Sequence, residues 1–128
     1  MSLVMERRGA EAKTIKRMEV WNVDLGKGED HVQGGVRPCL VVSNDIGNRY
    51  SPVVIIAPLT SSKIKKPMPT HVYVDAESCG MYSDSTILFE QILTIPKKKL
   101  EFKIFDMPKI YFKKIEKAMQ ISLSMSLT

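Results

Sequence analysis

Short apolar runs separated by turn-like segments limit the possible fold more than any other feature of this sequence. Residues Glu19–Leu25 alternate with the period of two that is typical of a strand with one partly wet face. Arg37–Asn44 is nearly continuous in apolar character, which indicates a buried strand, and Val53–Thr60 follows as a third strand. Between these runs, the glycine-containing segment Gly26–Gly35 is interpreted as a loop and Asp45–Pro52 as a polar turn. The first half of the chain therefore predicts β-structure.

Three further strand-like runs follow a basic loop at Ser61–Pro69. The first is Thr70–Asp75, and the second is Thr86–Gln91, with an optional continuation through a kink to Ile95. The third is Phe102–Phe105, which is shorter than the others. The pattern predicts six short strands in total.

The C-terminal residues change to a helical period. Asp106–Pro108 is typical of a helix start, because the first helical turn accepts a proline. One stripe then recurs at helical spacing, and we interpret it as a core or dimer contact: Ile115, Ala118, Met119, Ser122 and Met125. Together with the strands, this stripe predicts a mainly β, α+β fold, namely a small β-barrel with a packed C-terminal amphipathic helix.

The length of 128 residues fits one domain. We interpret residues 1–17 as an N-terminal extension, flexible or weakly helical, and residues 18–128 as the barrel domain. No stretch approaches the roughly 20 apolar residues of a membrane helix. The charged N-terminus also lacks the apolar centre of a signal peptide. These features predict a cytoplasmic protein that does not associate with membranes.

The sequence offers few residues for metal or cofactor chemistry. Its two cysteines are Cys39, expected in the core, and Cys79, and they form neither a CxxC motif nor a Cys/His cluster. The carboxylates form no array for two metals, and no phosphate-binding P-loop or dinucleotide motif is present. We therefore expect no metal and no cofactor. A pair formed by His31 and His71 could cleave RNA by acid–base catalysis, but nothing in the sequence brings these two residues together.

The net charge of +5 and the pI of about 9.3 are compatible with a polyanionic partner or with a solvated lysine surface. The most suggestive segment is Gln33–Pro38, where two glycines precede Arg37 at the start of a strand. An arginine fixed there could bind a phosphate through two N–H groups, and Thr60 could offer a hydroxyl to the same phosphate. From the residues alone, however, a glycine turn beside a surface arginine is the favoured interpretation.

Six motifs in order resemble the MazF/PemK family, and most closely its Gram-positive branch. The resemblance covers about residues 18–125, although Met18 stands where the family usually has glycine. The motifs are Gln33–Pro38, Leu40–Asp45 with Gly47–Arg49, Pro58–Thr60, Pro69–Val72, Asp84–Leu88 running into Glu90–Ile92, and Ala118–Leu123.

This resemblance implies an SH3-like barrel that works as a homodimer and is held inactive by a cognate antitoxin. It implies that Arg37 and Thr60 are the catalytic pair of an endoribonuclease, a toxin that cuts single-stranded mRNA. It further implies RNA contacts from a set of polar and glycine residues: Gln33, Gly34, Gly35, Asn44, Ser61 and Gln91. The target expected from the nearest branch resembles UACAU.

The implied reaction needs no metal. The RNA 2′-hydroxyl attacks the adjacent phosphorus and leaves a 2′,3′-cyclic phosphate and a 5′-hydroxyl, so the nucleophile is already tethered. Arg37 is suited to stabilise the developing negative charge and is a poor general base, because its pKa lies above about 12. Thr60 would bind the phosphate, and the group that removes the 2′-proton is not evident from the sequence.

Two alternatives have different sequence signatures. A gyrase-poisoning toxin with the same barrel lacks the Arg/Thr pair and uses a C-terminal Trp-Gly-Ile ending. Here Trp21 is the only tryptophan and the chain ends in Ser126–Thr128. A non-catalytic RNA-binding module is the second alternative, and retention of Arg37 and Thr60 argues against it.

Overall fold

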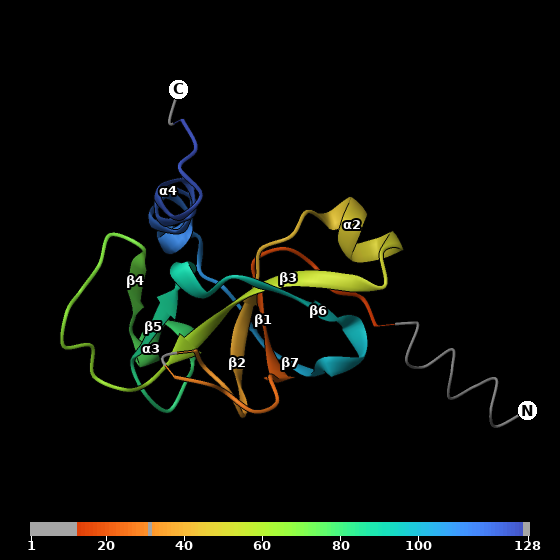
Figure 1. Cartoon of the computed structure of the whole chain (residues 1–128), viewed down its shortest axis with the longest axis horizontal. Coiled ribbons are helices and arrows are strands. Elements are labelled where there is room, and N and C mark those ends of the chain that lie inside the picture. Colours follow the sequence, from red (N-terminus) through yellow and green to blue (C-terminus); the bar gives the residue numbers. More distant parts are fainter. Residues whose placement is uncertain (1–12, 31, 127–128) are drawn as a thin grey trace, which may run out of the picture.

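The computed structural model describes residues 13–30 and 32–126. Its architecture is a strongly curved antiparallel sheet with one long C-terminal helix packed beside it (Figure 1). The strands are β1 (Glu19–Asp24), β2 (Val36–Val41), β3 (Val53–Thr60), β4 (His71–Val74), β5 (Ser85–Leu88), β6 (Leu93–Pro96) and β7 (Leu100–Asp106). The helices are α2 (Asp45–Tyr50), α3 (Ala76–Cys79) and α4 (Phe112–Ser122), and three short 3₁₀ turns accompany them: Phe89–Gln91, Lys97–Lys99 and Lys109–Tyr111.

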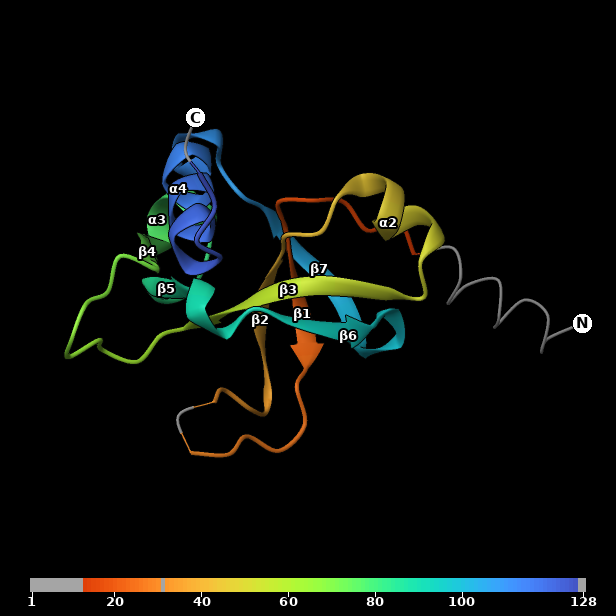
Figure 2. The same cartoon turned by 45° about the horizontal axis from the view of Figure 1, so that its top comes forward.

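The sheet is organised around β3, which crosses the molecule in both views (Figure 1, Figure 2). Strand order is β4-β5-β3-β2-β1-β7, and β6 pairs with the first half of β3 while β5 pairs with its end. Among the described strands no pairing closes this order into a complete ring. The predicted fold class, mainly β with a C-terminal helix, is confirmed, whereas the barrel remains open.

Both faces of β2 from Cys39 to Val41 and of β3 from Ile56 to Thr60 are buried, which explains the nearly continuous apolar sequences there. Successive residues of a strand point to opposite faces. On β2, Leu40 belongs to a cluster that lies under α4, whereas Cys39 and Val41 belong to a second cluster between the strands. Strand β3 alternates in the same way, with Leu59 in the first cluster and Ile56 in the second. Burial of both faces holds β3, and therefore Thr60 at its end, in a fixed position.

Helix α4 packs on β4 and the Phe89–Gln91 turn with the predicted stripe, because Ile115 and Ala118 are fully buried. The Ser122 hydroxyl donates a hydrogen bond to the Phe89 carbonyl at 2.7 Å. Met125 lies beyond the end of the helix and is exposed, so the stripe is shorter than predicted. The helix also begins later than predicted, because Pro108 precedes a separate 3₁₀ turn, Lys109–Tyr111, and not the first turn of α4.

The predicted polar turn at Asp45–Pro52 is wrong, because residues Asp45–Tyr50 form helix α2. The Asn44 side chain caps this helix by accepting a hydrogen bond from the Gly47 N–H at 2.8 Å. Asn48 is buried and donates to the Ser43 carbonyl. A single short helix with glycine in its middle has too little apolar period to be recognised from sequence.

The optional continuation of the fifth strand to Ile95 corresponds to two separate strands. Strand β5 ends at Leu88, the 3₁₀ turn Phe89–Gln91 redirects the chain, and β6 begins at Leu93. The chain turns because Phe89 is fully buried in the cluster under α4. Residues 13–30 and 32–126 therefore contain seven strands where the sequence predicted six.

Part of the segment assigned to the N-terminal extension contacts the sheet. Ile15 is buried in the cluster between the strands, next to Trp21. The nearly buried Glu19 carboxylate accepts hydrogen bonds from the Lys16 N–H at 2.8 Å and from Trp21 Nε1 at 3.0 Å, and pairs with Lys103 at 3.0 Å. Residues 1–12 lie outside the described part, so the boundary at residue 18 stays a prediction.

Candidate active site

Arg37 lies near the start of β2, where the glycine loop joins the sheet. Its Nε–H donates a hydrogen bond to the Gly34 carbonyl at 2.9 Å, and an Nη1–H donates to the Leu59 carbonyl at 3.4 Å. The guanidinium is thereby held against the peptide that directly precedes Thr60. Loop and strand together fix an arginine that the sequence could not distinguish from an ordinary surface residue.

The loop between β1 and β2 depends on its glycines. Leu25 N–H donates to the Gly35 carbonyl and Gly35 N–H donates to the Gly26 carbonyl, so two hydrogen bonds close its base. Gly35 has φ of +75°, a value that favours glycine. A Cβ atom at Gly34 would lie 2.1 Å from the Gly28 backbone nitrogen, so only glycine fits there. The loop thus presents the Gly34 carbonyl to Arg37 through close backbone packing.

Thr60 ends β3, pairs with Thr86 of β5 and is nearly buried. Its Oγ1 accepts a hydrogen bond from the Ser62 N–H at 3.2 Å. A threonine hydroxyl that accepts in this way keeps its own proton for donation. Thr60 is therefore placed as a hydrogen-bond donor at the end of the strand whose Leu59 carbonyl holds Arg37.

Two neighbouring cavities meet at this point. Arg37 lines one of about 510 Å³, and Thr60 lines another of about 410 Å³. Ser61 and Ser85 line both cavities, so they mark the border between them. Arg37 and Thr60 therefore line two adjoining cavities that share Ser61 and Ser85.

The predicted RNA-binding residues do not form one cluster. The Gln91 side chain accepts a hydrogen bond from the Gln33 N–H at 2.8 Å, so the 3₁₀ turn after β5 touches the loop that holds Arg37. Gly34 contacts Arg37 itself, and Ser61 lies at the cavity border. Asn44 is different, because it caps α2 beyond the far end of β2, about 13 Å of strand away from Arg37.

The electrostatics around Arg37 favour an anion. Its two carbonyl partners leave three guanidinium N–H groups available, and within the described residues no carboxylate forms an ion pair with it. The nearby Cys39 thiol is buried between the strands, and this burial raises its pKa to about 12. Cys39 is thus the predicted core residue and not a nucleophile.

Both ring nitrogens of His71 form hydrogen bonds within the fold. Its Nδ1 accepts a hydrogen bond from the Met68 N–H at 3.2 Å, so Nε2 carries the proton and donates to Glu90 at 2.9 Å. Glu90 also accepts from the Thr70 hydroxyl at 3.0 Å. His31 lies outside the described residues, so the alternative of a histidine pair stays a prediction.

Two carboxylates that the sequence did not assign a role hold the segments around α3, and one of them, Asp84, lines the cavity of Thr60. Asp84 accepts hydrogen bonds from the Ala76 N–H and the Tyr73 hydroxyl, both at 2.7 Å, and these bonds lower its pKa. Asp75 caps α3 through the Ser78 N–H and accepts from the Tyr111 hydroxyl, which lowers its pKa as well. Asp84 lies in the motif Asp84–Leu88, but its hydrogen bond to the Ala76 N–H depends on the short helix α3, which the sequence did not predict.

Comparison with known proteins agrees with this geometry. The profile of the family described as "PemK-like, MazF-like toxin of type II toxin-antitoxin system" matches residues 16–123. This chain belongs to that family. Endoribonuclease EndoA of Bacillus subtilis (strain 168) is 46% identical over 111 residues, 87% of this chain and 96% of the relative. Endoribonuclease MazF of Staphylococcus epidermidis is 38% identical over 112 residues, 88% of this chain and 93% of that protein.

Solved structures confirm the fold of this PemK/MazF-family toxin. MazF (Form-I) from Deinococcus radiodurans has a TM-score of 0.74 at 18% identity, with 88% of this chain and 99% of that chain covered. An endoribonuclease in complex with its cognate antitoxin, from mycobacterial species, has a TM-score of 0.71 at 24% identity, covering 89% and 99%. The predicted resemblance to this family and its Gram-positive branch is confirmed, and the predicted endoribonuclease class agrees with the names of both curated relatives.

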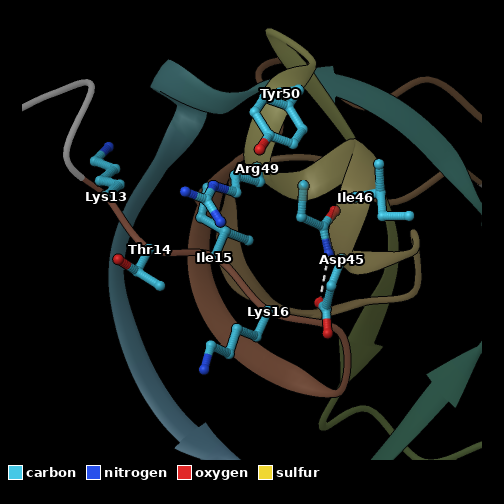
Figure 3. A pocket seen from close by; sticks show the side chains of 9 residues that line it. Lys13, Thr14, Ile15, Lys16, Asp45, Ile46, Arg49 and Tyr50 are labelled. Atoms are coloured by element: carbon cyan, nitrogen blue, oxygen red, sulfur yellow. Dashed lines mark hydrogen bonds between the residues drawn. The ribbon is translucent and has the colours of Figure 1, made fainter.

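A larger cavity of this MazF-like toxin lies elsewhere. It measures about 670 Å³ and is formed by residues 13–16 and α2 (Figure 3). Arg49 lies over the Tyr50 ring, 5.3 Å from the ring centroid, and both side chains are exposed. No predicted site residue lines this cavity, although Asn44 caps the helix that forms one wall.

Over residues 13–30 and 32–126, no group of three or more His, Cys, Asp or Glu side chains is arranged to hold a metal ion. Over the same residues, no helix combines the length and apolar character required to cross a bilayer. Metal independence itself stays a prediction.

Proposed function

We propose that this MazF-like toxin is a sequence-specific endoribonuclease that cuts single-stranded RNA without a metal. The observation that carries the proposal is the arrangement of Arg37. Its guanidinium is half-buried, is oriented by the Gly34 and Leu59 carbonyls, and has no carboxylate partner among the described residues. A fixed cation with unused N–H groups is suited to bind a phosphate and to stabilise charge that develops on it.

The scissile phosphate lies at the border of the two cavities, beside Ser61, in this proposal. Arg37 contacts its non-bridging oxygens from one side, and the Thr60 hydroxyl donates to it from the other. The 2′-hydroxyl of the same nucleotide attacks phosphorus, the P–O5′ bond breaks, and the products are a 2′,3′-cyclic phosphate and a 5′-hydroxyl. Because the nucleophile is tethered, a metal-bound hydroxide is unnecessary. DNA lacks this hydroxyl and is not cut.

Recognition uses the remaining polar groups around Arg37. Gln33, Gly34 and Gly35 are assigned to RNA contacts from the loop that holds Arg37, and Ser61 lies at the cavity border. Gln91 presents an amide, a group that reads the edges of unpaired bases. Asn44 is assigned to nucleotides farther along the strand, which lie near α2. The loop with Lys63, Lys65 and Lys66 adds positive charge along the RNA backbone, and the proposed target resembles UACAU.

The toxin acts in the cytoplasm as a homodimer, and a cognate antitoxin holds it inactive in this proposal. Support for the antitoxin comes from the family and from the mycobacterial neighbour, which is an endoribonuclease in complex with its antitoxin. Support for a second copy is the resemblance to the family.

The test is incubation of the purified protein with a UACAU-containing RNA and with a random RNA pool, both in excess EDTA. We expect cleavage by the wild-type protein, and its loss with Arg37→Ala but not with Arg49→Ala. RNA that is bound but left intact in both substrates contradicts catalysis and favours a non-catalytic RNA-binding module. Inhibition of gyrase supercoiling without RNA cleavage favours the gyrase poison.

A further inference from the structure

The cavity that holds Arg37 has an unusually apolar and exposed lining. Its lining includes one face of three neighbouring strands, where Phe102 of β7 pairs with Asn22 of β1, which pairs with Pro38 of β2. Phe102 is 57% exposed although it sits in the middle of its strand. Ile104, two residues along, shares this face and is also exposed. This face therefore presents apolar surface to solvent beside a cation.

A second exposed aromatic residue lines the same cavity. Tyr82 lies in the segment between α3 and β5, and its side chain is fully exposed. The backbone on either side of it is fixed, because Met81 N–H donates to the Ala76 carbonyl at 3.0 Å and Asp84 accepts from the Ala76 N–H. Gly80, with φ of +70°, ends α3 and turns the chain toward the cavity. Tyr82 is thus an uncovered ring on a rigid base.

We propose that Tyr82 and Phe102 are base-stacking residues, which bind an unpaired RNA base in this cavity while Arg37 holds the adjoining phosphate. The proposal rests on the proposed function. A nucleotide combines an anion with a flat aromatic ring, and the cavity offers a cation and two exposed aromatic rings for these two parts. The volume of about 510 Å³ falls within the roughly 300–1,000 Å³ of small-ligand sites.

The positive charge of Arg37 favours an RNA nucleotide over other occupants of this apolar surface. A purely apolar partner would leave the Arg37 guanidinium desolvated and without a counter-ion, which is costly. A nucleotide supplies the counter-ion and the stacking surface together. Because every base has an aromatic face, stacking on Tyr82 sets where the RNA lies, and its sequence is read by amides such as Gln91.

The test measures RNA binding apart from cleavage. The probe is the sequence that the wild-type protein cuts fastest in the random pool, synthesised with 2′-fluoro groups so that no nucleophile remains. We expect Tyr82→Ala and Phe102→Ala each to weaken binding by roughly fivefold to a hundredfold in fluorescence anisotropy. Tyr82→Phe keeps the ring and should bind like wild type. Tyr50→Ala is the matched control, because Tyr50 is an exposed tyrosine on α2, away from this cavity.

A mutant cycle with abasic nucleotides distinguishes stacking from a structural effect. At one position of the RNA, removal of the base should weaken binding to wild type but cause little further loss with Tyr82→Ala. Absence of such coupling at every position overturns the proposal. So does a change from dimer to monomer in light scattering of either alanine variant, because the patch would then be covered by a second copy.

The outcome is separable from that of the proposed function. If wild type cuts RNA, Arg37→Ala does not, and both aromatic variants bind the fluoro RNA like wild type, only the stacking inference fails. If wild type neither binds nor cuts any RNA in the pool, the proposed function fails, and the stacking inference fails with it.

Discussion

Two cavities of this toxin each contain an arginine and at least one exposed aromatic residue, yet their surroundings differ. In the larger cavity, Arg49 lies in solvent over the Tyr50 ring. In the smaller one, Arg37 is half-buried and oriented by two backbone carbonyls from separate parts of the chain. An arginine stacked on the surface is free to move, whereas a fixed one is arranged for a phosphate before RNA arrives. The constraint on the side chain, and not the size of the cavity, identifies the candidate site.

The comparison of the two cavities is tested most strongly by replacing each arginine with alanine in turn. We expect Arg37→Ala to reduce kcat/KM for RNA cleavage by about a hundredfold to a thousandfold, because one pre-oriented donor group is lost. Arg49→Ala should change it less than about twofold. Steady-state kinetics on a fluorogenic RNA measures both. Comparable losses in the two variants would mean that the cavities do not differ in function.

The glycine loop provides a second contrast. Gly34→Ala places a Cβ atom 2.5 Å from Gly28 Cα, so the loop must shift and the Gly34 carbonyl moves away from Arg37. We expect up to about a hundredfold loss of kcat/KM, because misplacement by about 1 Å can cost that much. Gly47→Ala in α2 is the control, since its Cβ would meet only ordinary contacts. Unchanged activity of Gly34→Ala would show that the loop does not position Arg37.

Replacement of Asn44 distinguishes a structural role of this residue from a contact with RNA. Asn44→Ala removes the cap of α2 and should cost about 1 kcal/mol of unfolding free energy, seen as a Tm lower by a few degrees. If Asn44 also contacts RNA as proposed, the affinity for the uncleavable RNA falls at a temperature where the variant is fully folded. A Tm loss without any change in affinity would restrict Asn44 to capping.

The smallest expected effect concerns the Asp84 carboxylate beside the Thr60 cavity. Its pKa is lowered in the folded protein by the Ala76 N–H and the Tyr73 hydroxyl. A carboxyl group with a lowered folded pKa stabilises the fold above its unfolded pKa of about 3.9, and this stabilisation is lost as the pH falls through the folded value. The Tm difference between wild type and Asp84→Asn should therefore shrink between about pH 6 and pH 3. A difference that is constant with pH would contradict this.

Strands with a clear apolar period were predictable from the sequence, and so was the buried stripe of α4, because burial of a face leaves its period in the chain. Helix α2 was not, since its six residues are held by the Asn44 cap and the buried Asn48, which leave no period. The turn at Phe89 was predicted only as an optional kink, because one buried aromatic residue redirects the strand without a glycine or proline to mark it.

The site was predictable only in part, for a related reason. The motif around Arg37 was visible, but its meaning depends on the Leu59 carbonyl, which lies 22 residues away in sequence. The division of Arg37 and Thr60 between two adjoining cavities has no sequence signal at all. The aromatic residues Tyr82 and Phe102 were not singled out, because exposure in a strand or loop cannot be read from residue type.

The central claim is that Arg37 acts on a phosphate attacked by its own 2′-hydroxyl, and the ends of the cut RNA test it most directly. Mass spectrometry of RNA cut in excess EDTA should show a 5′ fragment one water lighter than a linear phosphate, together with a 3′ fragment that carries a 5′-hydroxyl. With Arg37→Ala, neither product should accumulate at a comparable rate. Fragments with a 5′-phosphate and a 3′-hydroxyl, or cleavage that stops when EDTA is added, would contradict the account.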